Sequence, residues 1–299
     1  MIKIQVPATS ANLGSGFDSL GIALAMYNNI WVEECDHIDI ISKDRVDVPK
    51  DKSNLIFWSA DYLYKIVGKK LPGLKIIQEN NIPMARGLGS SSACIIAGLL
   101  AANSLLGNNF SKSELVNIAA EIEGHPDNTT PALLGGLVVT AVEGKNVYYD
   151  SVPVNDKIMF AVFIPPFQLK TSLARQALPE LYSKKDAVYN LSRSALMTAS
   201  LLSGNFENLK IAVQDKLHQP YRIKFIEGLD KVFRISYDLG SYGTYITGAG
   251  PSIISIVDET VGKIMKCKAI ANLEKDGVLG WRLELLKPDT LGATVNLDL

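Results

Sequence analysis

Residues 83–93 read Pro83-Met84-Ala85-Arg86-Gly87-Leu88-Gly89-Ser90-Ser91-Ser92-Ala93, and an apolar run that ends at Leu106 follows directly. This order predicts a flexible loop that opens into a buried helix. Gly87 and Gly89 lack a Cβ atom, so the backbone can turn sharply there and present N–H groups to a ligand. The serines fall where a helix leaves its first N–H donors without backbone partners. A helix start of this kind attracts anions, phosphate above all.

Two other nucleotide-binding loops do not fit this stretch. A Walker A loop requires Gly-Lys-Ser or Gly-Lys-Thr, and no lysine follows these glycines. The dinucleotide fingerprint requires a third glycine or alanine where Ser92 stands. It also requires an acidic residue about 20 positions later, where the chain has Ser111-Lys112-Ser113. A plain loop that caps a buried helix fits the stretch equally well when it is taken alone.

The length and the charge of the chain limit the classes of protein to which it can belong. The 299 residues suffice for two domains of ordinary size, with a core that needs no disulfide or metal. The 30 lysines and arginines are matched by 31 acidic residues, the net charge is −1, and no basic run exceeds two residues. Such a composition offers no basic patch to nucleic acid or to an anionic membrane, so we expect small-molecule partners.

The first residues show no export signal. Residues 1–7, Met-Ile-Lys-Ile-Gln-Val-Pro, alternate like a strand and lack the charged and apolar regions of a signal peptide. The longest apolar run, residues 94–106, is interrupted by Asn103 and Ser104 and is too short to span a bilayer. The three cysteines lie far apart, and the three histidines offer no zinc-binding spacing. We therefore expect a cytoplasmic protein with reduced cysteines.

The first part of the chain combines strands with helices. Periodic apolar residues predict strands at residues 2–6, 21–26, 30–34, 38–41 and 74–78. A polar, glycine-bearing loop, residues 7–18, separates the first two of them. A helix is expected to begin at Ser53 or Asn54, either of which makes a good N-cap. One face of that helix carries Leu55, Trp58, Tyr62 and Ile66.

A polar segment then lies between two apolar elements. A helix begins at the capping box Ser111-Lys112-Ser113-Glu114 and must end near Gly124. Residues 123–131 follow and read Glu-Gly-His-Pro-Asp-Asn-Thr-Thr-Pro, after which a strand-like run covers 136–142. Two carboxylates, an imidazole and an amide are concentrated here. Functional sites tend to be built in such segments.

The second part of the chain is richer in helices. Two strands are expected between residues 147 and 164, and Pro165-Pro166 breaks the chain after them. We place a domain boundary between residues 152 and 157, which gives domains 1–154 and 155–299. The patterns predict helices at residues 172–178, 186–202, 206–217, 228–237 and 260–273. Further strands are predicted at residues 244–246, 253–257 and 281–285.

Three glycine-bearing segments occur in a characteristic order. They are Pro7-Ala8-Thr9-Ser10-Ala11-Asn12-Leu13-Gly14-Ser15-Gly16-Phe17-Asp18, Gly87-Leu88-Gly89-Ser90-Ser91-Ser92-Ala93 and Thr247-Gly248-Ala249-Gly250-Pro251-Ser252. Together they resemble the three ordered motifs of the GHMP small-molecule kinases, over the whole length of the chain. Within that superfamily, the first motif and residues 123–128 are most similar to the homoserine kinases. Residues 171–179 and 218–222 resemble segments from which those enzymes supply substrate-binding arginines.

The resemblance implies a fold and a reaction. The fold is the α+β, two-domain GHMP kinase fold, with an N-terminal domain like the second domain of ribosomal protein S5 and a C-terminal ferredoxin-like α/β sandwich. The reaction is ATP-dependent phosphorylation of the side-chain hydroxyl of L-homoserine to O-phospho-L-homoserine, in threonine biosynthesis. A kinase of another alcohol such as mevalonate and a ligand-binding homologue without turnover are the alternatives. A homodimer is a further expectation from the family.

The resemblance also assigns the nucleotide site. It places ATP against Asn54, Pro83, Arg86, Gly87, Leu88, Gly89, Ser90, Ser91, Ser92 and Ala93. A second loop on the phosphate side would be formed by Gly248, Ala249 and Gly250. Mg²⁺ would be held by the Ser91 hydroxyl and the Glu123 carboxylate, because this hard ion prefers oxygen ligands. Glu121 is the alternative carboxylate, and Asn54 fits equally well as a helix N-cap.

Homoserine is a small zwitterion, so its site needs a cation for the carboxylate and an acceptor for the ammonium group. By resemblance, Arg175 and Arg222 bind the carboxylate and Asp18 accepts from the ammonium group. The hydroxyl end and the walls of the pocket would be formed by Asn12, His125 and Asn128.

The resemblance assigns catalysis to Asn128, Ser91 and Glu123. An amide such as that of Asn128 cannot take up a proton at neutral pH, so we expect no dedicated carboxylate base. Phosphoryl transfer depends mainly on alignment and on charge neutralisation, and the proton would leave late, to the γ-phosphate. Asp127 is the alternative proton acceptor.

Overall fold

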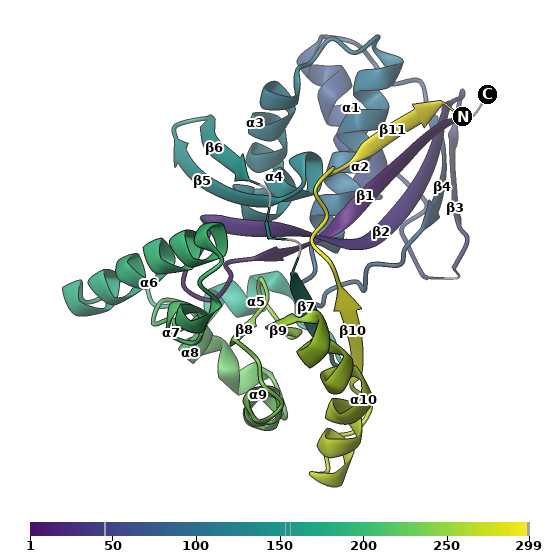
Figure 1. Cartoon of the computed structure of the whole chain (residues 1–299). Helices are drawn as coiled ribbons and strands as arrows, with labels where there is room; N and C mark the ends of the chain where they lie inside the picture. The colour runs from purple at the N-terminus through teal and green to yellow at the C-terminus, as the bar shows by residue number, and fades with distance from the viewer. Residues whose placement is uncertain (45, 153, 156, 298–299) are drawn as a thin grey trace.

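Two β-sheets organise the chain (Figure 1). The structure is a computed structural model and describes residues 1–44, 46–152, 154–155 and 157–297. The larger sheet contains seven strands and the smaller sheet four. Helices accompany both sheets, so the predicted α+β class is confirmed.

The larger sheet is built around β1 (Ile2–Ala11) and β2 (Leu20–Glu34), which pair antiparallel. Its other strands are β3 (Ile38–Ser42), β4 (Leu74–Glu79), β5 (Leu137–Glu143), β6 (Asn146–Val152) and β11 (Thr294–Leu297). The order is β11-β1-β2-β4-β3, and β5 joins β2 with β6 at its side. The 15 residues of β2 let its first part pair with β5 and its second part with β4.

Two predictions in this sheet were wrong. The sequence predicted separate strands at residues 21–26 and 30–34, but β2 runs through both. The loop predicted to begin at Pro7 begins only after Ala11, because β1 continues to that residue. The pairing register shifts between Pro7 and Ala8. Such an irregularity accommodates a proline, which has no N–H for a regular ladder, and the strand continues beyond it.

Four helices belong to the first part of the chain. They are α1 (Leu55–Ile66), α2 (Ser90–Leu105), α3 (Lys112–Glu123) and α4 (Pro126–Leu134). Helix α3 begins with the predicted capping box at Ser111 and ends at Gly124. No helix was predicted at α4. Its first residue is Pro126, a position where the fixed φ of proline suits a helix and its missing N–H costs nothing.

The apolar stripe predicted on α1 is not the buried one. Trp58 and Ile66 of that stripe are 41% and 49% exposed. The opposite side of the helix is buried, and α1 packs closely on α2. The buried residues are Ile56, Phe57, Ser59, Ala60, Leu63 and Tyr64. Both stripes have helical spacing, so periodicity alone could not choose between them.

The smaller sheet has the order β10-β7-β9-β8. Its strands are β7 (Ile158–Ile164), β8 (Gly243–Ile246), β9 (Ile253–Asp258) and β10 (Arg282–Leu286). Helices α9 (Leu229–Asp238) and α10 (Glu259–Lys275) pack on it and share an apolar core with it. The remaining helices of this part are α5 (Thr171–Gln176), α6 (Lys184–Ser203), α7 (Leu209–Ala212) and α8 (Gln219–Arg222), with 3₁₀ turns η1 (Phe206–Asn208) and η2 (Ile223–Phe225).

The helix predicted at residues 206–217 was wrong, because the chain breaks into η1, α7 and a turn. The Asp215 carboxylate accepts from the backbone N–H groups of Leu217, His218 and Gln219 over 2.6–2.9 Å. A buried aspartate that bonds the following backbone favours a turn over a continuing helix. This turn starts α8, which the sequence analysis did not predict.

The chain passes from the larger to the smaller sheet between β6 and β7 and returns at its end (Figure 1). Strand β11 pairs antiparallel with β1, from Gln5 opposite Thr294 onward. The connecting segment bonds to the end of α4, where Ala293 N–H donates to the Ala132 carbonyl over 2.9 Å. The domain boundary between residues 154 and 155 stays a prediction. Strand β11 follows that boundary in the sequence but belongs to the larger sheet, where it pairs with β1.

Neither a membrane span nor a disulfide is found in the part of the chain that the structure describes. Within it, no helix combines the length and apolar character needed to cross a bilayer. The three cysteines, Cys35, Cys94 and Cys267, are all free.

Candidate functional site

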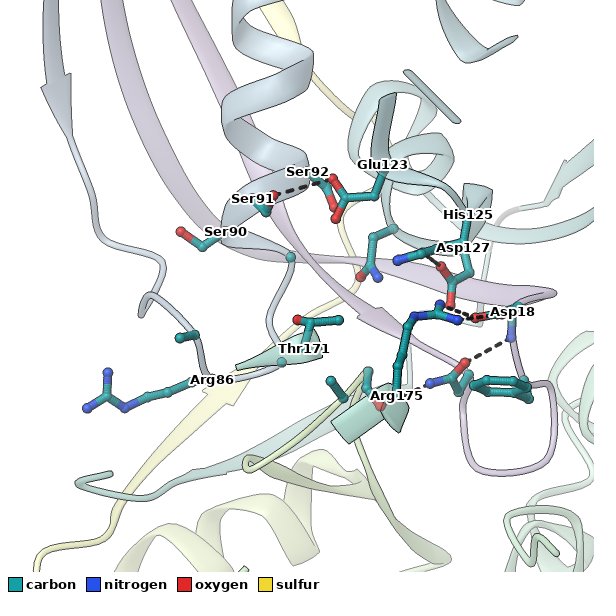
Figure 2. A pocket seen from close by; sticks show the side chains of 18 of the residues that line it. Asp18, Arg86, Ser90, Ser91, Ser92, Glu123, His125, Asp127, Thr171 and Arg175 are labelled. Carbon is teal, nitrogen blue, oxygen red and sulfur yellow. Dashed lines mark hydrogen bonds and ion pairs between the residues drawn. The ribbon is translucent and has the colours of Figure 1, made fainter. Parts of the chain in front are cut away.

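The three glycine-bearing segments meet at one cavity between the two sheets (Figure 2). The Thr247 hydroxyl donates to the Gly87 carbonyl over 2.7 Å, and the Gly248 N–H donates to the Ala11 carbonyl over 3.2 Å. The polar side chains lining the cavity are Asn12, Asp18, Arg86, Ser90, Ser91, Ser92, Glu123, His125, Asp127, Asn128, Thr171, Arg175 and Arg222. Segments far apart in the sequence therefore form one site.

The glycine loop presents an open helix start to this cavity. Gly87 and Gly89 have φ angles of +70° and +71°, which strain any residue with a Cβ atom. A Cβ atom on Gly87 would overlap the Thr247 carbonyl oxygen, and one on Gly89 would overlap the Thr9 hydroxyl. Helix α2 begins directly afterwards at Ser90, and its N-cap Gly89 has no side chain to bond the first N–H groups. These donors can bind an anion.

A hydroxyl and a carboxylate lie beside this helix start. The Ser91 hydroxyl donates to the Glu123 carboxylate over 3.4 Å (Figure 2). Burial raises the pKa of Glu123, although the nearby His125 opposes the shift. Glu121, the alternative carboxylate, is exposed and pairs with Lys145 over 3.2 Å. The two oxygen donors at Ser91 and Glu123 suit a hard divalent cation.

A bidentate ion pair closes the other end of the cavity. Arg175, on α5, donates to the two carboxylate oxygens of Asp18 over 2.7 Å and 3.1 Å (Figure 2). The Asp18 N–H donates to Asn12 Oδ1 over 3.0 Å, and Asn12 Nδ2 donates to the Gly248 carbonyl over 3.0 Å. Burial lowers the pKa of Arg175, but the hydrogen bonds and charge of Asp18 outweigh it and raise the pKa. A cation and an anion are thus held side by side.

Arg222 lies behind this pair and is 1% exposed. Its Nη1 atom donates to the Gly248 carbonyl over 2.8 Å and to His218 Nδ1 over 2.9 Å. Burial and the positive charge of Arg175 lower the pKa of Arg222 to about 10, so the guanidinium stays charged at neutral pH. The ring of Phe17 lies 5.5 Å from the Arg222 guanidinium carbon and 5.7 Å from that of Arg175. No role was predicted for Phe17, although it lies inside the first motif beside Asp18.

The start of α4 supplies the wall between these two ends. His125 Nδ1 contacts Asp127 Oδ1 over 2.5 Å. Burial lowers the pKa of His125, but the hydrogen bond and charge of Asp127 outweigh it and raise the pKa. Asn128 follows, and its Oδ1 accepts from the Thr9 hydroxyl over 2.8 Å. Thr9 uses one of the two lone pairs of the Asn128 oxygen, and the amide NH₂ can donate to a ligand.

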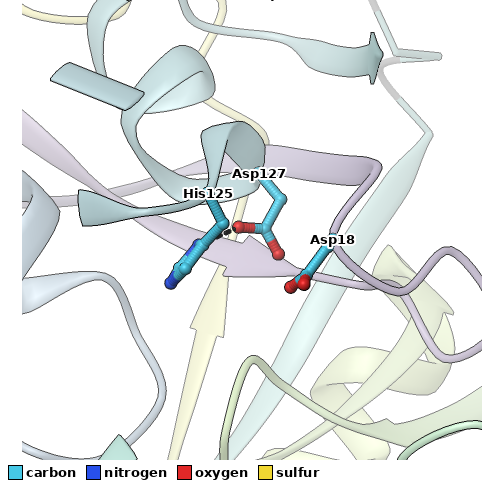
Figure 3. Close-up of side chains that lie close together, drawn as sticks. All are labelled: Asp18, His125 and Asp127. Carbon is cyan, nitrogen blue, oxygen red and sulfur yellow. Dashed lines mark hydrogen bonds and ion pairs between the residues drawn. The ribbon is translucent and has the colours of Figure 1, made fainter. Parts of the chain in front are cut away.

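Asp18, His125 and Asp127 also form the most compact acidic and histidine group of the site (Figure 3). Each offers one ligand atom within 4.8 Å of the others. Spacing along the sequence did not reveal this trio. The guanidinium of Arg175 already bonds both oxygens of Asp18, so a cation is supplied there by the chain itself. This arrangement weighs against a metal ion at the trio.

Asn54 does not reach the cavity. Its side chain is 3% exposed and caps α1, where Oδ1 accepts from Ile56 N–H over 3.0 Å. Its Nδ2 atom donates to the Pro49 carbonyl over 3.0 Å and to Gln78 Oε1 over 3.3 Å. The contact of Asn54 with adenine stays a prediction, and in this structure the polar atoms of Asn54 bond within the chain.

Arg86 lines the cavity, but its guanidinium points away from Ser91 (Figure 2). It donates to the carbonyls of Pro165, Pro166 and Met84 over 3.0, 2.9 and 3.2 Å. The side chain thus ties the glycine loop to the segment after β7 and does not face the helix start. Three more of the residues predicted to contact ATP do not line the cavity, and these are Pro83, Leu88 and Ala93. Leu88 and Ala93 are buried in the core, and Pro83 lines a neighbouring cleft.

An apolar groove adjoins the helix start and was missed by the sequence analysis. It is lined by Leu55 and Trp58 of α1, Ile95 of α2 and Ile122 of α3, together with Ser91 and Glu123. The signal for it in the sequence was the apolar stripe predicted on α1. Leu55 and Trp58 of that stripe line this groove and not the core.

Comparison with known proteins identifies relatives along the whole chain. Residues 54–136 match the family of GHMP kinases N terminal domain, and residues 197–275 match the family GHMP kinases C terminal. A homoserine kinase of Caldicellulosiruptor bescii is 46% identical over 297 residues, which are 99% of this chain and 97% of that protein. A homoserine kinase of Clostridium beijerinckii is 43% identical, with 99% and 98% covered. The crystal structure of homoserine kinase from Cytophaga hutchinsonii superposes with a TM-score of 0.89 at 28% identity, covering 99% and 97%.

Proposed function

The chain belongs to the homoserine kinases of the GHMP kinase superfamily, and we propose a role for its site residues in that reaction. The enzyme uses ATP to phosphorylate the side-chain hydroxyl of L-homoserine, a step of threonine biosynthesis. One observation carries the assignment of roles. The open start of α2 and the Asp18–Arg175 pair line one cavity, so an anion site lies beside a site for a zwitterion.

The α2 start is assigned to the ATP phosphates. The first N–H groups of α2 and the backbone of residues 87–89 bind phosphate oxygens, as helix starts do for anions. The apolar groove at Leu55, Trp58 and Ile95 receives the adenine ring in place of the Asn54 contact. Gly248 and Ala249 also line the same cavity.

Ser91 and Glu123 are assigned to Mg²⁺. Their 3.4 Å contact places a hydroxyl and a carboxylate together beside the phosphate site, which fits an ion that prefers one or two carboxylates plus phosphate oxygens. When bound, Mg²⁺ neutralises charge on the phosphates of ATP. The ion pair of Glu121 with Lys145 favours Glu123 as the carboxylate ligand.

Homoserine is assigned to the end of the cavity that holds Asp18. Arg175 and the charged Arg222 bind its carboxylate, and Asp18 accepts from its ammonium group. Without substrate the two charges of Asp18 and Arg175 satisfy each other, and the zwitterion takes the place of that contact. Mevalonate has no ammonium group for Asp18, which speaks against the mevalonate-type alternative.

Asn128 is assigned to orient the substrate hydroxyl through its NH₂ group, and Thr9 donates to its carbonyl oxygen. The Asp127 carboxylate is 2% exposed and in contact with His125. We assign Asp127 to the orientation of His125 and retain a reaction without a dedicated carboxylate base. Alignment and charge neutralisation then supply most of the barrier reduction, and the hydroxyl proton leaves late.

Cytoplasmic location and a homodimer belong to the same proposal. An exposed apolar groove on α6, lined by Leu191 and Leu202 together with Leu20 and Val139, is the surface we assign to a second copy. Its apolar character supports this choice, because exposed apolar patches mark interaction surfaces. Sedimentation of the purified chain with and without a Leu191→Glu substitution tests it.

A coupled ADP-release assay tests the assignment of function. The enzyme is supplied with ATP, Mg²⁺ and, in turn, homoserine, mevalonate, galactose or threonine. We expect turnover of homoserine to exceed that of the other alcohols by orders of magnitude. Equal turnover of all four, or tight homoserine binding without ADP release, would overturn the proposed roles.

A further inference from the structure

A second cleft adjoins the start of the glycine loop and has a volume of about 540 Å³. Its walls come from residues 80–86, from the end of β7 and from the start of β10. The residues that line it are Val46, Asn80, Asn81, Ile82, Pro83, Met84, Arg86, Ile164, Pro165, Pro166, Gln168, Gly280 and Arg282. The roles proposed above for ATP, Mg²⁺ and homoserine do not use this cleft, although the resemblance places ATP against Pro83 and Arg86, which line it.

The charged residues that line the cleft are two arginines, Arg86 and Arg282, and the part of the chain that the structure describes places no carboxylate in its lining. The polar side chains beside them are the amides of Asn80, Asn81 and Gln168. Amides and guanidinium groups can all donate hydrogen bonds. The lining therefore has the donors and the positive charge that an oxyanion requires.

The pairing of strands brings the two arginines together. Arg282 lies opposite Ile164 in the ladder between β10 and β7. The guanidinium of Arg86 bonds the carbonyls of Pro165 and Pro166, the two residues that follow Ile164. Burial and the charge of Arg282 lower the pKa of Arg86. Two like charges are thus held close to each other at the end of one strand.

Little in the surroundings neutralises this pair. Arg282 lies 3.8 Å from Glu284, a long ion pair, and Glu284 also pairs with Lys266 over 3.2 Å. Among the described residues, Arg86 has no carboxylate within ion-pair distance. The nearby Asp44 does not line the cleft, and its carboxylate accepts from the backbone N–H groups of Val46 and Asn80.

Arg86 keeps donors for a ligand. A guanidinium group carries five N–H donors, and three of those of Arg86 are used by the backbone carbonyls of Met84, Pro165 and Pro166. An anion between the two arginines would accept from the remaining donors and would remove the repulsion between the two charges.

We propose that this cleft binds a small phosphate-bearing anion between Arg86 and Arg282, at a site separate from those of ATP and homoserine. The anion is inorganic phosphate or the phosphate group of a monoester, and both offer the same oxygens to the two guanidinium groups. Because Arg86 also ties the glycine loop to the end of β7, an occupied cleft stabilises that contact. The site therefore links the phosphate level to the conformation of the loop.

Calorimetric titration of the enzyme tests this site. The enzyme is first saturated with homoserine and a non-hydrolysable ATP analogue, so that its substrate sites are filled. Inorganic phosphate or O-phosphoserine is then added. We expect one binding event per chain for at least one of the two. Tighter binding of phosphate identifies the free ion as the occupant, and tighter binding of O-phosphoserine identifies a monoester.

Two variants locate the binding event. Arg282→Gln removes one of the two charges, and we expect its Kd to rise at least tenfold. Arg234→Gln removes a charge from the same part of the chain, where Arg234 pairs with Asp276 outside the cleft, and we expect its Kd to stay unchanged. Arg282 and Arg234 are both exposed, and thermal unfolding checks that the two variants fold. Loss of binding once the ATP analogue is present, equal Kd values for Arg282→Gln and the unchanged enzyme, or equal binding of acetate would overturn the proposal.

Discussion

The hydroxyl of Thr9 donates to the carboxamide oxygen of Asn128 over 2.8 Å, although 119 positions separate the two residues. The same hydroxyl lies against Gly89, where a Cβ atom would overlap it. One buried side chain of β1 therefore contacts both the glycine loop and the start of α4. These are the elements assigned to ATP and to the substrate hydroxyl.

Replacement of Thr9 by valine tests this relationship. The variant keeps the volume of the side chain but leaves the Asn128 oxygen without its donor, so the amide can rotate. We expect kcat to fall about tenfold, which corresponds to one lost hydrogen bond of ordinary strength. Steady-state kinetics with homoserine measures it. Thr244→Val, a change of another buried threonine in β8, is the control, and an equal loss in both variants would contradict the specific role of Thr9.

We predict different effects on the rate for substitutions of the two carboxylates near the end of α3. Glu123→Gln removes the carboxylate next to Ser91, and we expect kcat to fall roughly 100-fold and the Mg²⁺ concentration for half-maximal rate to rise. Glu121→Gln breaks only an exposed ion pair with Lys145 and should change neither quantity more than about twofold. Rates measured across a Mg²⁺ titration decide between them. The reverse pattern would assign the ion to Glu121.

Arg175 is expected to determine homoserine affinity. Lysine at this position keeps the charge but cannot form a bidentate contact with a carboxylate. We expect Arg175→Lys to raise the KM for homoserine roughly 30-fold, about 2 kcal/mol, with the KM for ATP nearly unchanged. Arg193→Lys on α6 serves as the control. A rise in the KM for ATP alone would move Arg175 to the nucleotide site.

Arg86 is expected to affect ATP binding through the glycine loop and not by contacting the phosphates of ATP. A lysine can bind phosphate but cannot bond three carbonyls, so Arg86→Lys should behave like Arg86→Met. We expect both variants to raise the KM for ATP by about tenfold, because the glycine loop loses its tie to the end of β7. If the lysine variant keeps the original KM while the methionine variant does not, Arg86 contacts phosphate directly.

His218 makes stability depend on pH. Its Nδ1 accepts from Arg222 and its Nε2 donates to the Gly14 carbonyl over 2.6 Å, so the folded protein holds the neutral ring. Burial lowers the pKa of His218 from 6.5 to about 4. Below pH 6.5 this histidine takes up a proton in the unfolded chain, whereas in the folded chain it takes up a proton only near pH 4. The free energy of unfolding therefore decreases as the pH falls from 6.5 to about 4.

Urea unfolding between these two pH values measures the effect. We expect the free energy of unfolding to decrease less steeply in His218→Gln than in the unchanged enzyme, because glutamine takes up no proton. The two histidines elsewhere in the chain are present in both proteins and cancel in the comparison. If the free energy of unfolding decreases equally steeply with falling pH in the two proteins, His218 is not the cause of the pH dependence.

Local signals predicted part of the site and missed the rest. The start of α3 at Ser111 and its end at Gly124 follow from capping rules, which depend on a few neighbouring residues. Asn54 satisfied its capping rule too, and in this structure its polar atoms bond within the chain. The direction of Arg86 could not be predicted, because two of the three carbonyls that bond it lie 79 and 80 positions away.

The sequence by itself determined the family, the two-sheet α+β fold and the identity of the three glycine-bearing segments, because those depend on residue types in a fixed order. Only the tertiary structure decided which stripe of α1 is buried, that β11 pairs with β1, and that Glu123 and not Glu121 lies beside Ser91. Each of these outcomes depends on a partner far away in the chain. Spacing and propensity describe neighbours along the sequence, whereas burial and long-range hydrogen bonds are set by packing between elements.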